Sequence, residues 1–171
     1  HCRLPTLSLI YARYGSSFVA RMQQSDAFIQ GFPIAGAGEV QWRRSVTQVA
    51  PDLGGIAAGP GTDATFCYDD HFAHLILRVS PAALTQRLAV LIDRPVDPPL
   101  QLTGKTDPVR AAAQARLLRF VAEEMDRGAD RLPDPVVAEL EDAILVSYLL
   151  TNQHNYSTLL NGAARSVAPW Q

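Results

Sequence analysis

The sequence predicts an α+β protein in which a strand-rich first half precedes a helical second half. Nine of the 13 aromatic residues lie before Ser80, whereas the residues after it are rich in Ala, Leu, Arg and Glu at helical spacing. Short apolar runs before Ser80 are separated by turn signals about every eight to twelve residues, which is typical of a small β-sandwich or barrel. We therefore expect a sheet domain first and helices afterwards.

Residues 28–43 organise the predicted sheet domain. Two runs rich in aromatic and β-branched residues flank residues 35–38 (Ala-Gly-Ala-Gly), whose glycines can adopt the positive φ values of a tight reversal. We expect two antiparallel strands here, with one face of the first carrying the larger side chains. Pro33 cannot donate to a ladder, which places this strand at an edge or beside a bulge. The other predicted strands are residues 7–14, 17–22, 46–49, 56–58, 64–68 and 72–79.

Three helices are predicted after the sheet domain. Ser80-Pro81 combines an N-cap hydroxyl with proline at the first helical position, so a helix over residues 81–92 follows. The second begins at Asp107-Pro108 and runs to about Arg127, where Gly128 ends it. The third runs from Asp134-Pro135 to near residue 152, and the short loop between the last two predicts an antiparallel pair.

The last two helices carry more apolar surface than one partner would cover. Leu118 and Met125 extend the stripe of the first, and the second has a wide stripe through Ile144. This surface can pack on the strand domain or, alternatively, form a self-association face. The predicted dimer-interface residues are Leu118, Met125, Val137, Leu140, Ile144 and Tyr148.

Charge and cysteine content narrow the function classes. Residues 1–80 hold six basic and six acidic side chains, and residues 81–171 hold nine and eleven, so neither half has the basic excess of a nucleic-acid-binding surface. Cys2 and Cys67 form at most one bridge and have no metal-ligand spacing, which indicates a reduced, cytoplasmic setting. There is no apolar run of about 18 residues, so no membrane partner is expected.

The order of these features resembles a known family. Residues 32–38 (Phe-Pro-Ile-Ala-Gly-Ala-Gly), 59–61 (Gly-Pro-Gly) and 75–84 resemble the N-terminal regulatory domain of AraC/XylS-type transcription regulators. The tail, with residues 154–157 (His-Asn-Tyr-Ser) and 167–170 (Val-Ala-Pro-Trp), is similar to the segment that joins this domain to two helix-turn-helix modules.

The resemblance implies a domain plan. Residues 1–80 would form a cupin-like, jelly-roll-like β-barrel that binds a small-molecule effector, and residues 81–160 a helical subdomain that mediates homodimerisation. Residues 161–171 would be a linker towards DNA-binding modules that are absent from this chain. The expected function is that of the regulatory domain of a transcription factor, without enzyme activity or cofactor.

The barrel interior is the predicted ligand site, since an apolar pocket with a few polar groups is what effector recognition requires. Arg13, if it points inside, favours an anionic effector such as a carboxylate. Each polar candidate can instead face solvent, and each aromatic one can be ordinary core, because register does not reveal the inner face. The predicted ligand-binding residues are Tyr11, Arg13, Gln30, Phe32, Trp42 and His74.

Two alternatives remain open. A cupin-type metal-dependent enzyme would need several converging ligands, but His71 and His74 fall on opposite faces of a strand and cannot share an ion. The sequence contains no Gly-x-Ser-x-Gly elbow, dinucleotide-binding motif or P-loop. The other alternative is a dimerisation module whose barrel is filled by its own side chains.

Overall fold

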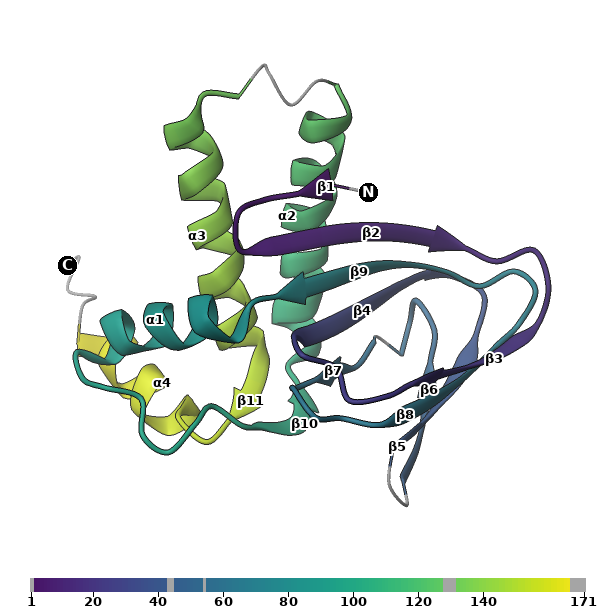
Figure 1. Ribbon diagram of the computed structural model, residues 1–171, viewed down its shortest axis with the longest axis horizontal. Helices are drawn as coiled ribbons and strands as arrows, with labels where there is room; N and C mark the ends of the chain where they lie inside the picture. The colour runs from purple at the N-terminus through teal and green to yellow at the C-terminus, as the bar shows by residue number, and fades with distance from the viewer. Residues whose placement is uncertain (1, 43–44, 54, 128–131, 167–171) are drawn as a thin grey trace. The chain divides into compact units, whose positions relative to one another are not determined.

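A computed structural model describes residues 2–42, 45–53, 55–127 and 132–166 of the chain. The chain divides into two compact units, His1–Ser80 and Pro81–Gln171 (Figure 1). The predicted helix end at Gly128, most of the predicted loop 128–133 and residues 167–171 lie outside the described part. The strands of the first unit are β1 (Cys2–Arg3), β2 (Leu7–Arg13), β3 (Phe18–Met22), β4 (Phe28–Ala35), β5 (Gly38–Trp42), β6 (Ser45–Val49), β7 (Ala57–Ala58), β8 (Ala64–Tyr68) and β9 (Ala73–Val79).

These strands form two antiparallel sheets (Figure 1). The first has the order β1-β2-β9-β4-β7 and the second β3-β8-β5-β6. The predicted α+β class and the strand-rich first half are confirmed, but the described strands form two separate sheets and no pairing closes them into a barrel. A buried cluster is formed by residues of the second sheet together with Phe72, which precedes β9; its members are Val40, Val49, Ala64, Tyr68 and Phe72.

The segment predicted as an antiparallel pair around residues 35–38 forms a corner between the sheets. β4 pairs with β7 and β9, and β5 pairs with β6 and β8, so the expectation that they pair with each other is wrong. The β4–β9 register shifts between Pro33 and Ala35, which confirms the predicted bulge. Gly36 takes a φ of 70°, and the Asp69 carboxylate accepts from Ala37 N at 2.6 Å. The chain therefore turns sharply from one sheet into the other.

The second unit is helical, with one small sheet. Its first three helices agree with the prediction, and α2 and α3 pack as an antiparallel pair (Figure 1). The structure adds the antiparallel pair β10–β11 and a fourth helix, which covers part of the predicted linker. The elements are α1 (Pro81–Ile92), β10 (Leu102–Thr106), α2 (Pro108–Asp126), α3 (Asp134–Thr151), β11 (Asn152–His154) and α4 (Ser157–Ser166).

Polar contacts fix the helices of this unit. Asp107 caps α2 by accepting hydrogen bonds from Val109 N at 3.0 Å and Arg110 N at 3.1 Å. Arg87 on α1 forms an ion pair with Asp142 on α3, with Nη2 and Oδ2 2.6 Å apart. None of the described helices combines the length and apolar character needed to cross a membrane.

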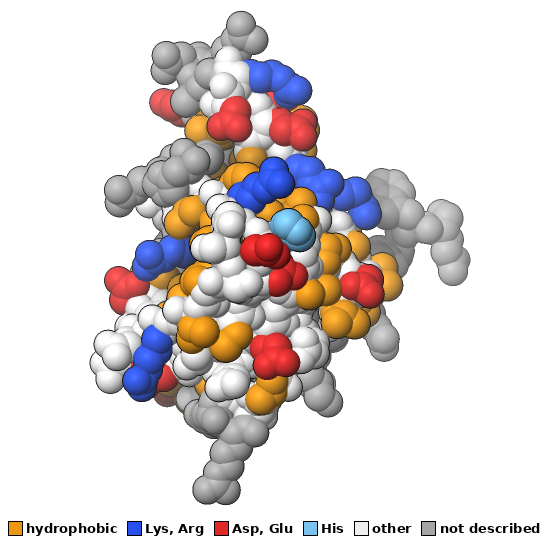
Figure 2. All heavy atoms as spheres, turned by 90° about the vertical axis from the view of Figure 1, so that its right-hand side faces the viewer, with side chains coloured by type: hydrophobic (Ala, Val, Ile, Leu, Met, Phe, Trp, Pro, Cys, Tyr) orange, Lys and Arg blue, Asp and Glu red, His pale blue; other side chains and the backbone are white. Residues whose placement is uncertain are grey.

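The surface carries both signs of charge. Figure 2 shows acidic, basic and apolar side chains interspersed over the face that it draws. This mixture agrees with the even division of charge along the sequence.

Candidate functional site

A cavity of about 290 Å³ lies within the first unit, and both sheets contribute to its lining. Where a strand contributes more than one lining residue, these alternate along it and share one face, as they do on β3, β4, β8 and β9. Most of the lining is apolar, which suits the burial of a small molecule. The lining residues are Ile10, Tyr14, Phe18, Ala20, Met22, Ile29, Gly31, Ile56, Ala58, Phe66, Tyr68, His74, Ile76 and Arg78.

The two sheets supply different walls. The first sheet contributes the isoleucines Ile10, Ile29 and Ile76 from three neighbouring strands. The second contributes aromatic rings, of which Phe66 is 5.8 Å from Tyr68 between ring centroids. The cavity therefore has an aliphatic side and an aromatic side.

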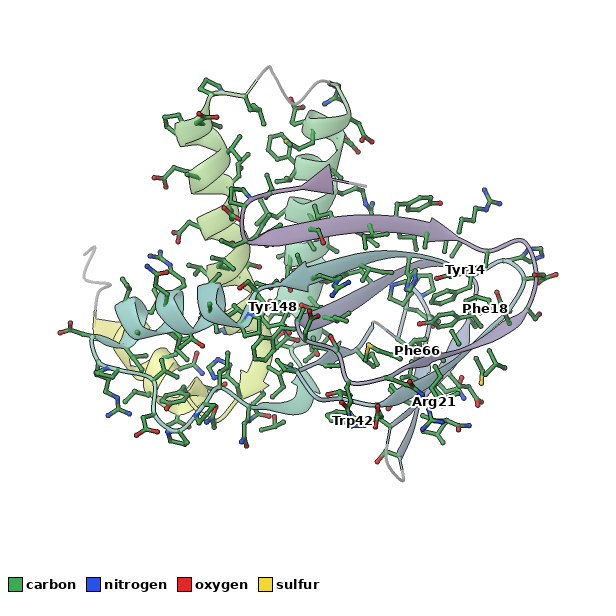
Figure 3. The ribbon with its side chains drawn as sticks, viewed as in Figure 1. Tyr14, Phe18, Arg21, Trp42, Phe66 and Tyr148 are labelled. Carbon is green, nitrogen blue, oxygen red and sulfur yellow. The ribbon has the colours of Figure 1, made fainter. Side chains whose placement is uncertain are left out.

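Tyr14 connects the aromatic wall to the polar part of the cavity. Its ring lies 4.1 Å from that of Phe18 between centroids, and Figure 3 shows the two side chains together where β2 leads into β3. Its backbone N–H donates to Phe72 O at 3.0 Å, which holds the residue just beyond the end of β2. The Tyr14 hydroxyl forms a hydrogen bond with Nε2 of His74 at 3.2 Å.

Burial keeps this polar pair uncharged. Desolvation lowers the pKa of His74 from 6.5 to about 4, so the imidazole is neutral near pH 7. Desolvation also raises the pKa of the Tyr14 hydroxyl above its ordinary value. A neutral imidazole and a phenol can each donate or accept a hydrogen bond, so the pair can adapt to either kind of ligand group.

Among the described residues that line the cavity, Arg78 is the one with a permanent charge. Its Nη2 forms an ion pair with Asp26 Oδ1 at 3.0 Å, and both side chains are substantially exposed. His74 and Arg78 lie four residues apart on β9, a distance of roughly 13 Å along an extended strand. The cavity thus has a neutral polar site at one end and a paired cation at the other.

One predicted ligand residue, His74, lines the cavity. Tyr11 and Arg13 are exposed, and the exposed fraction of Tyr11 is 55%. Both lie on the face of β2 opposite to Ile10, which lines the cavity. Gln30 and Phe32 are buried but belong to the face of β4 opposite to Ile29 and Gly31.

Trp42 does not line the cavity either. It is half-buried at the end of β5, and Figure 3 shows it away from Tyr14 and Phe18. The structure therefore does not bring the six predicted residues together, and it does not bring Arg13, the proposed partner of an anion, to this cavity.

The aromatic wall was not predicted from the sequence. Phe66 and Tyr68 are two residues apart on β8, and Tyr14 and Phe18 flank the Gly15-Ser16 turn. Two signals could have identified this side of the site. One is a pair of aromatic residues two positions apart on a strand, and the other is a second aromatic pair on either side of a turn.

The predicted dimer residues fall into two groups. Leu118, Ile144 and Tyr148 are fully buried within the single chain, and Figure 3 shows Tyr148 on α3. Met125, Val137 and Leu140 are half-buried. The large apolar side chains that α2 and α3 do expose are Val109, Phe120 and Val136.

The described residues include no group of three or more His, Cys, Asp or Glu side chains placed to hold a metal ion. His71 is exposed and lies 3.8 Å from Asp70, whereas His74 faces the cavity. The two histidines are therefore apart, but His71 lies in the turn before β9 and not on the opposite face of the same strand, as the sequence predicted.

Two antiparallel sheets around an apolar cavity, followed by a helical unit, define a cupin-like α+β protein. Residues 1–150 match the AraC-binding-like domain family, and the chain belongs to this family. The resemblance to AraC-type regulators noted in the sequence is thereby confirmed. None of the curated proteins matches the sequence at a significant level.

Three solved structures are similar to parts of this chain. The AraC-like transcriptional activator CuxR is 15% identical with a TM-score of 0.57, and the match covers 84% of this chain and 50% of CuxR. This chain therefore spans half the length of CuxR. KdgF from Halomonas sp. is 15% identical with a TM-score of 0.41, over 48% of this chain and 79% of KdgF. A cupin-2 domain protein from Shewanella frigidimarina is 9% identical with a TM-score of 0.39, over 46% of this chain and 74% of that protein.

Proposed function

We propose that this chain is the effector-binding regulatory domain of an AraC-like transcription regulator that acts in the cytoplasm, and that the cavity in its first unit holds the effector. The observation that carries the proposal is the cavity of about 290 Å³ between the two sheets in a chain of the AraC-binding-like family. DNA contacts would come from a further domain of the regulator, as the family resemblance implies.

The composition of the cavity supports effector binding. Its apolar walls would supply favourable burial, on the order of 25 cal/mol per Å² of apolar surface. The Tyr14–His74 pair would discriminate between ligands, because a molecule without a matching group leaves buried polar atoms unpaired. An effector acts on transcription only through different contacts in two states of the regulator, and this cavity is the place where such contacts would be made.

The test is a calorimetric titration of the 171-residue chain against small carboxylates, sugars and neutral aromatic compounds, repeated with Gly31→Leu. Gly31 lines the cavity, and a Cβ added there would have His74 Nδ1 at 3.7 Å as its nearest neighbour. A leucine side chain would therefore occupy the ligand space. A library member that binds the natural chain and not the variant supports the proposal. Absence of binding by every member, or binding that Gly31→Leu does not change, refutes it.

We further propose that the chain forms a homodimer through the exposed side of α2 and α3. Val109 is 78% exposed and Phe120 51%, and both lie on α2, which leaves large apolar side chains in solvent unless a partner covers them. Half-buried Met125, Val137 and Leu140 from the predicted interface would lie at its margin. Sedimentation equilibrium should show a dimer that Phe120→Glu dissociates.

The matched control is Val90→Glu, which places the same charge at an exposed apolar position of α1. This variant should leave the dimer intact. A monomeric natural chain, or equal effects of the two substitutions, would contradict the proposed interface. Metal analysis of the purified protein would separate this function from a metal-dependent cupin enzyme.

A further inference from the structure

We infer that the cavity takes an uncharged, planar aromatic compound with one carbonyl or hydroxyl group, and that Tyr14 and His74 bind this group. The inference rests on the proposed function, since it names the ligand class of the same cavity. It differs from the carboxylate expected from Arg13, which is exposed and outside the cavity lining.

The walls of the cavity select a flat and small ligand. A planar ring bound in the cavity would lie between the isoleucine side, with Ile29 and Ile76, and the aromatic side, with Phe18 and Phe66. Aromatic side chains favour another ring in offset or edge-to-face contact, which a saturated ring does not reproduce. A volume of about 290 Å³ is at the lower end for ligand sites, so a long acyl chain or an oligosaccharide would not fit.

The polar end of the cavity offers one hydrogen-bonding site. The Tyr14 hydroxyl and His74 Nε2 are 3.2 Å apart, and both residues line the cavity. After this hydrogen bond is made, the Tyr14 hydroxyl can still form one with a ligand. We therefore expect a ligand with one oxygen at that end. Further polar groups along the ligand would meet Ile76 and the other apolar side chains and would lose their hydration without compensation.

The charges around the cavity disfavour an ion. Among the described residues no Asp or Glu lines it, so an organic cation would find no carboxylate partner in that part of the lining. Arg78 already pairs with Asp26 through Nη2, and solvent exposure of both side chains weakens its attraction for a carboxylate in the cavity. His74 is held neutral by burial, so it supplies no positive charge near pH 7.

Four related probes separate these requirements. Acetophenone has the planar ring and one carbonyl, cyclohexyl methyl ketone lacks the planar ring, toluene lacks the oxygen, and benzoate carries a charge. Calorimetry with the 171-residue chain at neutral pH should rank acetophenone first. We expect benzoate to bind at least about tenfold more weakly, because its charge must be desolvated. Toluene should bind more weakly than acetophenone by roughly three- to tenfold, which corresponds to the loss of one neutral hydrogen bond.

Tyr14→Phe keeps the ring and removes the hydroxyl. This substitution should weaken the binding of acetophenone by roughly three- to tenfold and leave the affinity for toluene unchanged. Tyr11→Phe is the matched control, because it removes a hydroxyl from an exposed tyrosine on the face of β2 opposite to the cavity and should alter neither probe. His74→Gln is the second variant, and it should also affect acetophenone more than toluene.

Gly31→Val separates failure of this inference from failure of the proposed function. If benzoate binds more tightly than acetophenone and Gly31→Val abolishes both, the ligand class is wrong and the effector cavity stands. If another compound binds in a Gly31-dependent manner and acetophenone does not bind, the ligand class is again overturned. Binding of the probes that Gly31→Val leaves unchanged overturns both proposals.

Discussion

Replacing Gly31 with alanine should stabilise the protein, which is unusual for a substitution in the interior of a sheet. Gly31 is paired on β4, its φ is not in the left-handed region, and its N–H donates to Ile56 O at 3.0 Å. An added Cβ would enter the cavity, with His74 Nδ1 at an ordinary contact distance of 3.7 Å. The native backbone therefore accepts alanine, while the unfolded chain loses conformational freedom.

The expected gain is about 0.4–1 kcal/mol in the free energy of unfolding, from the reduced entropy of the unfolded chain. For a protein of this size the melting temperature should rise by roughly 1–4 °C, measured by circular dichroism or calorimetry. Gly36→Ala is the opposite control, because Gly36 has a φ of 70° and its Cβ would lie 2.6 Å from Phe72 N. A clear fall in the melting temperature of Gly31→Ala would mean that the space beside His74 is not free.

Three further predictions concern the core, a helix cap and pH. Phe72→Ala should lower the free energy of unfolding, measured by chemical denaturation, by about 3–5 kcal/mol. Phe72 is fully buried, and its ring stacks on that of Tyr68 with 3.9 Å between the ring centroids. A loss below about 1 kcal/mol would contradict this packing. Asp107→Ala should cost about 1 kcal/mol and Asp107→Asn much less, since the side-chain oxygen caps α2; equal losses would refute the capping role. Because the pKa of His74 falls from 6.5 to about 4 on folding, the unfolded chain binds more protons between these values, and stability should decrease as the pH falls from 7 towards 4. His74→Gln should reduce this pH dependence, and an unchanged slope would show that His74 is accessible to protons.

Local chemistry in the sequence was sufficient for most element boundaries. Ser80-Pro81 predicts the start of α1, and Asp107-Pro108 predicts the start of α2. Such starts can be located in the sequence because an N-cap side chain and a proline affect only the first turn of the helix beside them. The bulge at Pro33 follows in the same way from the missing N–H. The short strands β10 and β11 were not predicted, because they pair across about fifty residues and carry little apolar alternation.

The inner face of the first sheet could not be predicted. β2 places Leu7 and Leu9 on one face and Ile10 on the other, so its alternation does not distinguish the cavity side. β4 has the same ambiguity, since Phe28 and Phe32 oppose Ile29. Only the packing of the first sheet against the second resolves the choice, and packing between distant strands is not encoded in local periodicity.

The small sheet of the second unit has a consequence for chain cleavage. β10 precedes α2 and β11 follows α3, and the Asn155 side chain also accepts from Gln101 N at 2.9 Å and donates to Pro99 O at 3.0 Å. A chain cut between α2 and α3 would therefore yield two fragments that remain joined by this strand pair and its flanking contacts. Such fragments, produced separately, are suited to reassembly as a complementing pair whose association reports on the integrity of the helical unit.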